Sequence, residues 1–253
     1  MNIFEYPVNT DKIIKNKKKH IKDLSLKKNL TEKKIAILGG TTTADLKSNL
    51  ELNLLSIGIK PIFYESNYNQ YFEEAIYSNK IELFNPDIII IATSHHNLQL
   101  TESTSLPIET ITKNIEKEFN KFKRIWEKLI KSTNSIIIQN NFDLPTTRTL
   151  GQLDSYAGGL SYAIHKLNIM FSEFANTTKQ LHIHDYHYLT SFHGIKQWKD
   201  ETFWYAYKYA NNINMTPLYS NNLCNLIAAI YGKSKKCLIL DLDNTLWGGR
   251  HRR

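Results

Sequence analysis

Short apolar runs alternate along this chain with longer segments in which apolar residues recur at helical spacing. The apolar runs occupy residues 34–38, 61–64, 88–92, 135–139 and 180–185. Helical spacing occurs over residues 46–55, 68–77, 108–131, 153–177 and 217–231. Unbroken apolar runs are typical of strands that are buried on both faces of a parallel sheet. The alternation therefore predicts an α/β fold, a doubly wound, mostly parallel sheet with helices on both faces.

Changes in composition divide the chain into three predicted parts. Residues 1–32 are expected to form a basic N-terminal arm with one helix over about 11–24, and residues 33–232 the α/β domain. A glycine-containing turn separates the last predicted helix from a sixth apolar run at 237–240. Residues 233–253 are therefore expected to begin a second domain.

The chain of 253 residues carries a net charge of +8, and much of the excess lies between Lys12 and Lys34. This block lacks the interleaved aromatic residues of a nucleic-acid stacking surface, so nucleic-acid recognition is disfavoured. A solvated helix face and a surface for an anionic partner both stay open. No apolar run is long enough to span a membrane, and the first residues lack a signal-peptide pattern. Two cysteines, Cys224 and Cys237, without disulfide or metal spacing predict a cytoplasmic protein.

Two carboxylates, Asp241 and Asp243, follow the apolar run at 237–240, and the Thr245 hydroxyl comes two residues later. Ligands of open α/β sheets bind beyond the carboxyl ends of the strands. Two acids with a hydroxyl at such a place suit Mg²⁺ binding through oxygen and the handling of a phosphoryl group. An acidic turn after a strand is also common without any such function, so the pair alone does not decide between the two.

The longer string around these acids resembles a known family. The letters DLDNT at 241–245 match the first motif, DxDxT, of the haloacid-dehalogenase (HAD) superfamily, and DLDNTLWGG is similar to its FkbH-like branch, HAD subfamily IIIC. The resemblance implies that Asp241 is the phosphoryl-accepting nucleophile, Asp243 the general acid/base and Thr245 a phosphate contact. Asp241 and Asp243 would also hold Mg²⁺. It further implies a phosphorylated small-molecule substrate, phosphatase or glyceryl-type acyl-transferase chemistry, and an acyl carrier protein as partner.

The resemblance to the HAD domain stops with the chain. After Gly249 the sequence has four basic residues, 250–253, and then ends. A HAD domain needs further strands, a downstream Lys or Arg for the phosphate and more acids for Mg²⁺. We therefore expect a truncated HAD domain that is not competent for phosphoryl transfer as this fragment. The four basic residues fit a native end, a frameshift product or a cloning scar equally.

Polar residues follow three of the predicted strands, at 39–43, 94–97 and 140–141. This arrangement resembles the SGNH-hydrolase fold, in which a turn after the first strand holds the nucleophile and Gly and Asn loops after later strands supply an oxyanion hole. FkbH-like proteins are similar to such folds in their N-terminal region. The resemblance therefore implies an SGNH- or flavodoxin-like domain ahead of the HAD motif.

An SGNH-like site would use few residues of this chain. They are Thr41 as the hydroxyl nucleophile, His95 or His96 as its base, and Asn97 and Asn140 as polar groups at the strand ends. The family pattern has Asp and Ser at the positions of Gly40 and Thr41, and its Asp-x-x-His spacing is not kept near Asp185. A threonine that caps the next helix and a histidine that serves only as a hydrogen-bond partner are the alternative interpretations.

Two further groups of residues have structural alternatives. His182, His184 and His187 form an H-x-H-x-x-H array, but a zinc site there would need another ligand and an open position. The aromatic residues from Trp198 to Tyr209 are more typical of packing between elements than of a ligand cage.

Two alternatives to the phosphoryl-transfer interpretation stay open. They are a residual esterase and a non-catalytic binding or scaffolding domain.

Overall fold

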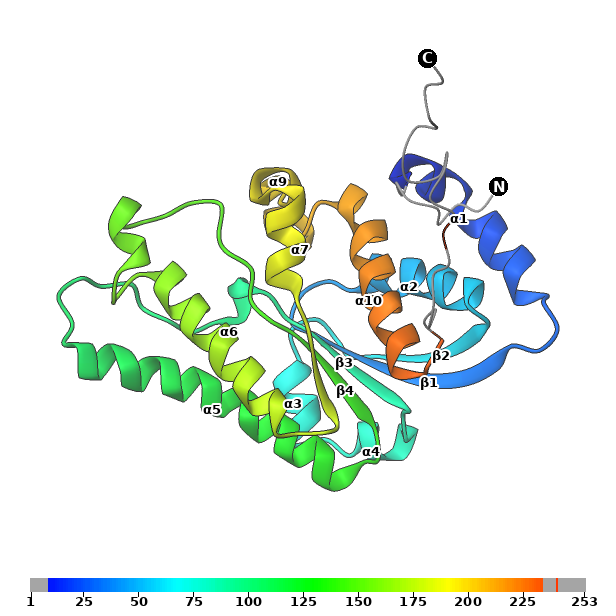
Figure 1. Cartoon of the computed structure of the whole chain (residues 1–253), viewed down its shortest axis with the longest axis horizontal. Helices are drawn as coiled ribbons and strands as arrows, with labels where there is room; N and C mark the ends of the chain where they lie inside the picture. The colour runs from blue at the N-terminus through cyan, green and yellow to red at the C-terminus, as the bar shows by residue number, and fades with distance from the viewer. Residues whose placement is uncertain (1–8, 234–239, 241–253) are drawn as a thin grey trace, which may run out of the picture.

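The computed structural model of the chain describes residues 9–233 and Leu240. Among these residues, five strands form one sheet in the order β2-β1-β3-β4-β5, and every neighbouring pair is parallel (Figure 1). The strands are β1 (Thr31–Gly39), β2 (Ile59–Glu65), β3 (Ile88–Ala92), β4 (Ile136–Asn140) and β5 (Leu181–His184). The strand order reverses direction between β1 and β3, which is the switch point where open α/β sheets bind ligands. The predicted doubly wound fold is confirmed.

Helices cover both faces of the sheet (Figure 1). One layer holds α3 (Tyr71–Ile76), α4 (Lys80–Phe84), α5 (Ile108–Ser132) and α6 (Leu160–Asn176). The other holds α2 (Ala44–Ser56), α7 (Tyr186–His193), α8 (Ile195–Trp198) and α10 (Thr216–Ile230). Alternation along β3 sends Ile89 and Ile91 into the first layer and Ile88 and Ile90 into the second. All four are fully buried, which is why this run carries no polar residue.

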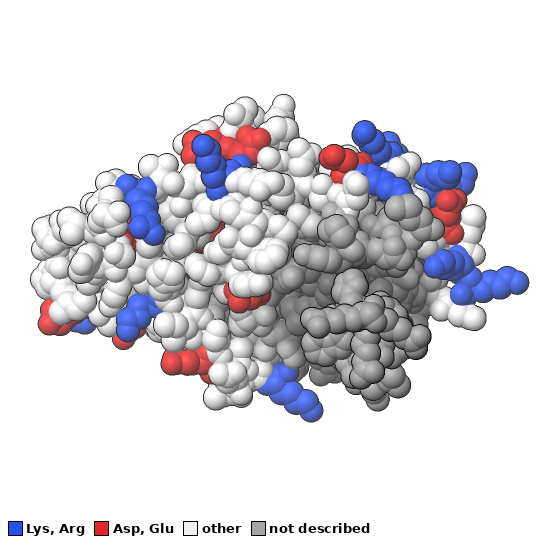
Figure 2. All heavy atoms as spheres, turned by 45° about the horizontal axis from the view of Figure 1, so that its top comes forward, with Lys and Arg blue, Asp and Glu red and all other residues white. Residues whose placement is uncertain are grey.

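The predicted helix of the basic arm is α1 (Thr10–Ser25), and it packs against the body of the molecule. The Asn9 side chain caps it by accepting a hydrogen bond of 2.9 Å from the Lys12 backbone N–H. Ile13 is buried against the domain, and the Lys17 ammonium lies 3.5 Å from the Asp45 carboxylate of α2. In Figure 2 basic side chains are concentrated at the end of the molecule where α1 lies.

The structure shortens the helix expected over residues 153–177. A 3-10 turn, η2 (Gly151–Ser155), precedes α6, which begins only at Leu160. The buried Asp154 carboxylate accepts hydrogen bonds from the backbone N–H groups of Leu160, at 2.9 Å, and Ser161, at 3.1 Å. This side-chain cap lies six residues ahead of the helix in sequence, so local helical spacing does not reveal where the helix starts.

The aromatic segment after β5 folds into short helices that the sequence pattern does not predict. They are α7, α8, α9 (Glu201–Tyr207) and the 3-10 turn η3 (Ile213–Met215). Trp198 is fully buried and donates a hydrogen bond of 2.9 Å from Nε1 to the Tyr186 hydroxyl, whereas α9 has no buried residue. No helix in the described part of the chain is both long and apolar enough to cross a membrane.

Candidate active site at the carboxyl ends of the strands

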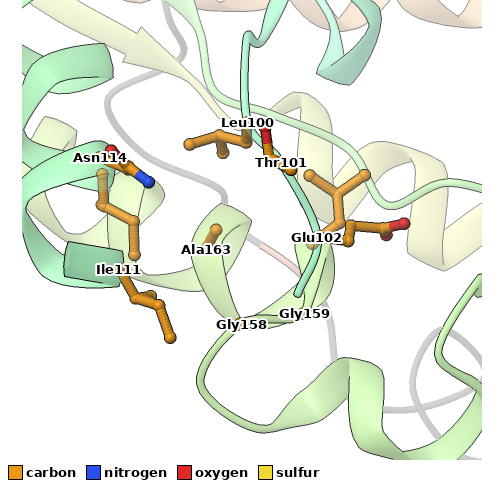
Figure 3. A pocket seen from close by; sticks show the side chains of 10 residues that line it. Leu100, Thr101, Glu102, Ile111, Asn114, Gly158, Gly159 and Ala163 are labelled. Atoms are coloured by element: carbon orange, nitrogen blue, oxygen red, sulfur yellow. The ribbon is translucent and has the colours of Figure 1, made fainter. Parts of the chain in front are cut away.

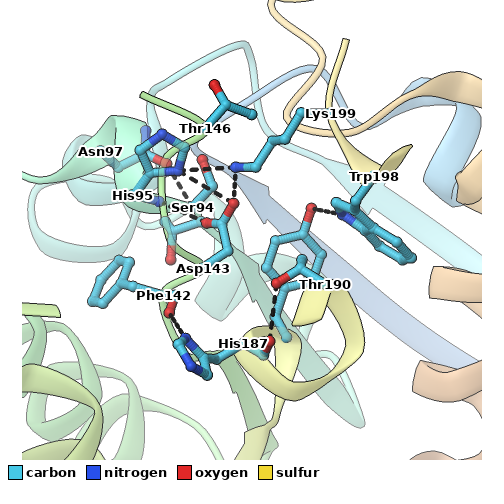
Figure 4. A network of polar contacts seen from close by, with 12 residues as sticks. Ser94, His95, Asn97, Phe142, Asp143, Thr146, His187, Thr190, Trp198 and Lys199 are labelled. Carbon is cyan, nitrogen blue, oxygen red and sulfur yellow. Dashed lines mark hydrogen bonds and ion pairs between the residues drawn. The ribbon is translucent and has the colours of Figure 1, made fainter. Parts of the chain in front are cut away.

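A buried ionic cluster lies where β3 and β4 end. Asp143, three residues beyond β4, is fully buried, and its Oδ2 contacts both the Lys199 ammonium and Nδ1 of His95, the latter at 3.2 Å (Figure 4). Its other oxygen, Oδ1, accepts a hydrogen bond of 3.0 Å from the His95 backbone N–H. The Lys199 ammonium also lies 3.1 Å from His95 Nδ1. One carboxylate therefore fixes both the backbone and the ring of His95.

The charges in this cluster stabilise one another. Burial alone would raise the pKa of the Asp143 carboxyl, but the Lys199 ammonium and His95 beside it hold that pKa well below its usual range. Lys199 is itself almost enclosed, with 6% of its side chain exposed. It sits between α8 and Asp200, whose side chain caps α9 by accepting a hydrogen bond from the Phe203 N–H. Asp143 is therefore a permanent carboxylate in the interior.

A pocket of about 180 Å³ opens beside the cluster, under α9. It is lined by His95, His96, Thr146, Lys199, Asp200, Glu201, Trp204, Tyr205, Tyr209 and Ala210. One wall is the His96 ring, which stacks on Trp204 with centroids 3.5 Å apart and planes 9° from parallel. Burial, together with the nearby His95 and Lys199, lowers the pKa of His96 to about 3, so that this ring is neutral at physiological pH. We name this cavity the α9 pocket.

The predicted nucleophile, Thr41, lines a different and smaller hollow, of about 10 Å³. That hollow also takes in Thr43, Asn140 and Tyr219, and it shares Tyr209 and Ala210 with the α9 pocket. The Tyr209 hydroxyl donates a hydrogen bond of 2.8 Å to Asp45, which holds this ring between the two cavities. Thr41 and His95 therefore line different cavities, and the described hydrogen bonds do not join them.

Asn97 connects the ends of β1 and β3. Its Nδ2 donates to the Gly40 carbonyl at 2.8 Å and to Oδ1 of Asn69 at 3.1 Å, while its Oδ1 accepts from the Ser94 N–H at 3.0 Å. A Cβ added at Gly40 would lie 2.5 Å from Asn97 Oδ1. This close approach explains why the chain has glycine where the SGNH pattern has an acid.

Asn140, which lines the same hollow as Thr41, belongs to a second polar network. Its Nδ2 donates to the Tyr219 hydroxyl at 2.7 Å and to the Thr93 carbonyl at 3.3 Å, and its Oδ1 lies 2.9 Å from Nδ1 of His184. The other ring nitrogen of His184 lies 3.0 Å from Oδ1 of Asn222. Burial lowers the pKa of His184 to about 4. Both amides proposed from the SGNH resemblance thus bond protein groups.

The threonines after β1 have separate partners. Thr43 is the N-cap residue of α2, yet its side chain makes no capping bond and donates instead to Glu65 at 2.7 Å. Thr42 holds the end of α9: its N–H donates to the Lys208 carbonyl at 3.0 Å and its hydroxyl to the Tyr207 carbonyl at 2.6 Å. Neither hydroxyl therefore caps α2, and the helix-capping interpretation is wrong for Thr42 and Thr43.

The histidine array and the acidic motif lie apart from the α9 pocket. His184 is buried in the network of Asn140, and His187 Nδ1 lies 3.1 Å from the Phe142 carbonyl. In the part of the chain that the structure describes, no three His, Cys, Asp or Glu residues are grouped so that they could hold a metal ion. Asp241, Asp243 and Thr245 lie outside the described residues, and their roles stay predictions.

A further hollow, of about 20 Å³, lies between α5 and the start of α6 (Figure 3). Leu100, Ile111 and Ala163 give it largely apolar walls, and Gly158 and Gly159 form its floor. A Cβ added at Gly159 would lie 2.2 Å from the Asp154 carbonyl oxygen, so close packing at the cap of α6 requires glycine there. This hollow contains none of the ionic cluster, which leaves the α9 pocket as the better candidate site.

Asp143 and Lys199 are the site residues that sequence reasoning missed. A signal was available in each case, because Asp143 comes two residues after the polar strand end at 140–141 and Lys199 lies in the aromatic segment. Neither signal tells which cation meets which carboxylate, since the two residues are 56 positions apart. His95 and His96 were both candidates, and the structure separates them: His95 contacts the acid, and His96 stacks on Trp204.

This fold is known from a solved structure. Among solved structures, the chain is similar to the N-terminal part of the protein BF1531 from Bacteroides fragilis, which contains a phosphatase domain and is complexed with Mg. The TM-score is 0.79 and the identity 24%, over 92% of this chain and 61% of that one, so this chain spans about six tenths of that structure. The C-terminal catalytic domain of Streptococcus pneumoniae peptidoglycan O-acetyltransferase A, with a methylsulfonyl adduct, has a TM-score of 0.42 and 14% identity over 81% of this chain and 94% of that domain. No curated protein matches the chain.

The chain matches a known sequence family over most of its length. At 24% identity, the likeness to the Bacteroides fragilis protein shows the fold alone. The model of the FkbH N-terminal domain, however, matches residues 34–228, which run from β1 into α10 and make up most of the chain. Every residue of the ionic cluster and of the α9 pocket falls within that range. The chain belongs to the FkbH family and contains its N-terminal domain.

Proposed function

We propose that this chain supplies the N-terminal α/β domain, residues 33–232, of an FkbH-like enzyme that handles phosphoryl groups. The observation that carries the proposal is the family match over 34–228, followed closely by the DxDxT string at 241–245. The similar Bacteroides fragilis structure contains a phosphatase domain, which supports the same order of domains. In this proposal residues 233–253 begin the HAD-like domain.

The acidic motif would carry the chemistry. Asp241 would take the phosphoryl group, Asp243 would act as general acid and base, and Thr245 would contact the phosphate. Two carboxylates one residue apart are a donor set that suits Mg²⁺, and the similar structure is complexed with Mg. When bound, the ion would neutralise charge on the transferring group. Asp241 and Asp243 are the residues that we assign to the ion, as the resemblance to the HAD motif implies.

The experiment compares this chain with a version that extends through the remainder of the HAD domain. We expect Mg²⁺-dependent hydrolysis of 4-nitrophenyl phosphate, or glyceryl-type acyl transfer, from the extended protein only, and its loss in Asp241→Asn. Sequencing the source DNA beyond the Gly249 codon shows which extension is native. Mg²⁺-dependent turnover by the 253-residue chain that Asp241→Asn abolishes would contradict our proposal that this fragment is not competent.

An acyl carrier protein is the partner that we propose for the intact enzyme. Such carriers are acidic, and the exposed lysines of α1, including Lys18 and Lys19, offer a basic surface of complementary charge. Lys17 belongs to that helix but is ion-paired with Asp45. The phosphorylated small molecule would be the second ligand. The carrier protein is proposed from the family resemblance and from charge, and the phosphorylated ligand from the family resemblance.

The alternative is a domain that binds or positions ligands without chemistry of its own. It is favoured by the full use of the Asn97 and Asn140 amides in protein contacts. A residual SGNH esterase would need Thr41 to meet His95, and these residues line different cavities. An assay with a chromogenic short-chain ester distinguishes the non-catalytic domain from the esterase. Hydrolysis that Thr41→Ala abolishes supports the esterase. Hydrolysis that persists in that variant, or no hydrolysis, rules it out.

A further inference from the structure

We propose that His95, held by Asp143, is a general base that takes a proton from a thiol or hydroxyl which a ligand brings into the α9 pocket. The proposal concerns a site separate from the acidic motif at 241–245 and does not depend on it. It rests on three features of the described residues: the orientation of the His95 ring, the absence of a suitable nucleophile in the pocket wall, and the enclosed ion pair behind the ring.

The ring of His95 is oriented from one side only. Nδ1 faces Asp143 Oδ2 at 3.2 Å and the Lys199 ammonium at 3.1 Å, inside the protein (Figure 4). The second nitrogen, Nε2, makes no hydrogen bond among the described residues, and the His95 side chain lines the α9 pocket with 9% of its surface exposed. A base needs a ring nitrogen that no protein group occupies and an acid that fixes the other nitrogen, and His95 has both.

The pocket wall does not supply a nucleophile to this base. Three hydroxyl-bearing residues line the pocket, and the Thr146 hydroxyl donates to Glu201 at 2.9 Å while that of Tyr209 donates to Asp45 at 2.8 Å. Tyr205 is 71% exposed, so its side chain is not fixed against the base. The Ser94 hydroxyl is buried and does not line the pocket. The ligand must therefore carry the group that is deprotonated.

The size and lining of the pocket set what can enter. A volume of about 180 Å³ takes the end of a chain-like ligand rather than a large ring system. Trp204, Tyr205 and the neutral His96 give apolar surface beside the polar cluster. A neutral thiol or alcohol at the end of a flexible chain fits both properties, because it buries apolar methylene groups and places one protic atom at the base.

The ion pair behind the ring defines its electrostatic surroundings. The charged and titratable groups around His95 are Asp143 from the β4 end, Lys199, the neighbouring His96, Asp200 at the N-cap of α9, and three α9-pocket residues, Glu201, Tyr205 and Tyr209. The carboxylate and the ammonium both contact Nδ1, so this nitrogen is not available to a ligand.

The proposed step is a proton transfer to His95 that is followed by acyl transfer to the ligand. The S–H or O–H bond of the ligand breaks as its proton moves to Nε2 of His95, and the electron pair stays on sulfur or oxygen. With 4-nitrophenyl acetate as the reporting electrophile, this pair forms a bond to the acetyl carbon. The bond from that carbon to the phenolic oxygen then breaks, 4-nitrophenolate leaves, and His95 releases its proton to water.

The test measures 4-nitrophenolate release by the full chain from 4-nitrophenyl acetate, with and without a chain-like thiol, N-acetylcysteamine, or the matching alcohol, N-acetylethanolamine. We expect an acceptor-dependent rate that His95→Gln lowers at least tenfold, with mass spectrometry showing the acetylated acceptor. The matched control, His165→Gln, changes an exposed histidine of α6 that does not line the pocket and should keep the wild-type rate.

Each other outcome overturns the proposal. An acceptor-dependent rate that is absent, or equal in His95→Gln and the wild type, removes His95 as base. A stable acetyl group on Thr146 or Ser94, with loss of the rate in Thr146→Val or Ser94→Ala, would show that the chain supplies the nucleophile. Unfolding midpoints of all variants, followed by circular dichroism, exclude loss of folding as the cause.

Discussion

Asp143 brings a full negative charge into the interior, and its partners make that charge tolerable. The substitution Asp143→Asn keeps the shape of the side chain but leaves the Lys199 ammonium, 6% exposed, without its carboxylate. Breaking a buried ion pair from one side typically costs about 3–5 kcal/mol, because the remaining charge is buried and uncompensated. We expect a loss of this size in the free energy of unfolding, measured by urea denaturation.

The double variant Asp143→Asn/Lys199→Met is the control for that prediction. Removing the ammonium together with the carboxylate leaves no isolated charge, so the double variant should recover much of the lost stability. If the double variant is as unstable as the sum of the two single variants, the pair has no mutual stabilisation and the cluster is not an ion pair.

His184 makes the stability of the fold depend on pH. Burial lowers its pKa from an ordinary 6.5 to about 4. Between these pH values the unfolded chain binds a proton that the folded chain does not. The contribution of His184 to the free energy of unfolding is therefore fully present above pH 6.5 and is lost as the pH falls toward 4. The contribution is on the order of 3 kcal/mol over that range. Urea titrations between pH 4 and 7 should show a shallower pH dependence in His184→Gln than in the wild type, and identical slopes would refute the assignment.

At the scale of elements, α9 is held by contacts at its two ends and by the stacking of Trp204 on His96, with no buried residue of its own. The Thr42 hydroxyl bonds the Tyr207 carbonyl at its last turn. We expect Thr42→Val to remove about 1 kcal/mol of local stability, which corresponds to about fivefold faster amide hydrogen exchange in peptides that cover 201–208.

Thr43→Val is the matched control for α9. The Thr43 hydroxyl bonds Glu65 rather than α9, so exchange in 201–208 should stay at the wild-type rate. Equal acceleration by both variants would mean that the loop after β1 is disturbed as a whole. No acceleration in Thr42→Val would show that the stack on His96 holds the helix without the hydroxyl.

The sequence predicts strands and long helices well because their burial is local and periodic. The four isoleucines of β3 can only lie inside a covered sheet, and α5 shows one apolar stripe over its whole length. The short helices α7, α8 and α9 carry no such stripe, since their aromatic residues divide between core, pocket and solvent. Their positions are fixed by partners distant in sequence, such as Tyr186 for Trp198 and Thr42 for Tyr207.

At the scale of the whole molecule, the candidate site follows from topology and only in part from residue type. Parallel strands place the ends of β1, β3 and β4 at one edge, which the alternation of elements predicts. His95 was predictable as a polar strand-end residue. That Thr41 and His95 line different cavities was not predictable, because Tyr209, which lines both, is held by a hydrogen bond to Asp45, more than a hundred residues earlier.

Charge is also distributed at this scale, and it yields a prediction about the proposed carrier partner. The net charge is +8, and the exposed Lys18 and Lys19 of α1 lie at the end of the molecule where basic side chains gather. We expect Lys18→Glu/Lys19→Glu to weaken binding of an acidic acyl carrier protein about tenfold at low salt, an effect of about 1.4 kcal/mol. Isothermal titration calorimetry measures it, and salt near 0.5 M should abolish most of the difference.

The control for the carrier prediction makes the same change of charge elsewhere. Lys113→Glu/Lys117→Glu replaces two exposed lysines of α5, which lies at the opposite end of the molecule from α1 (Figure 1). Lys17 is left unchanged in both variants, because its ion pair with Asp45 supports the residue that holds Tyr209, and its loss would disturb the pocket wall. If both double variants weaken carrier binding equally, attraction comes from net charge alone; if only the α1 variant does, the carrier docks on α1.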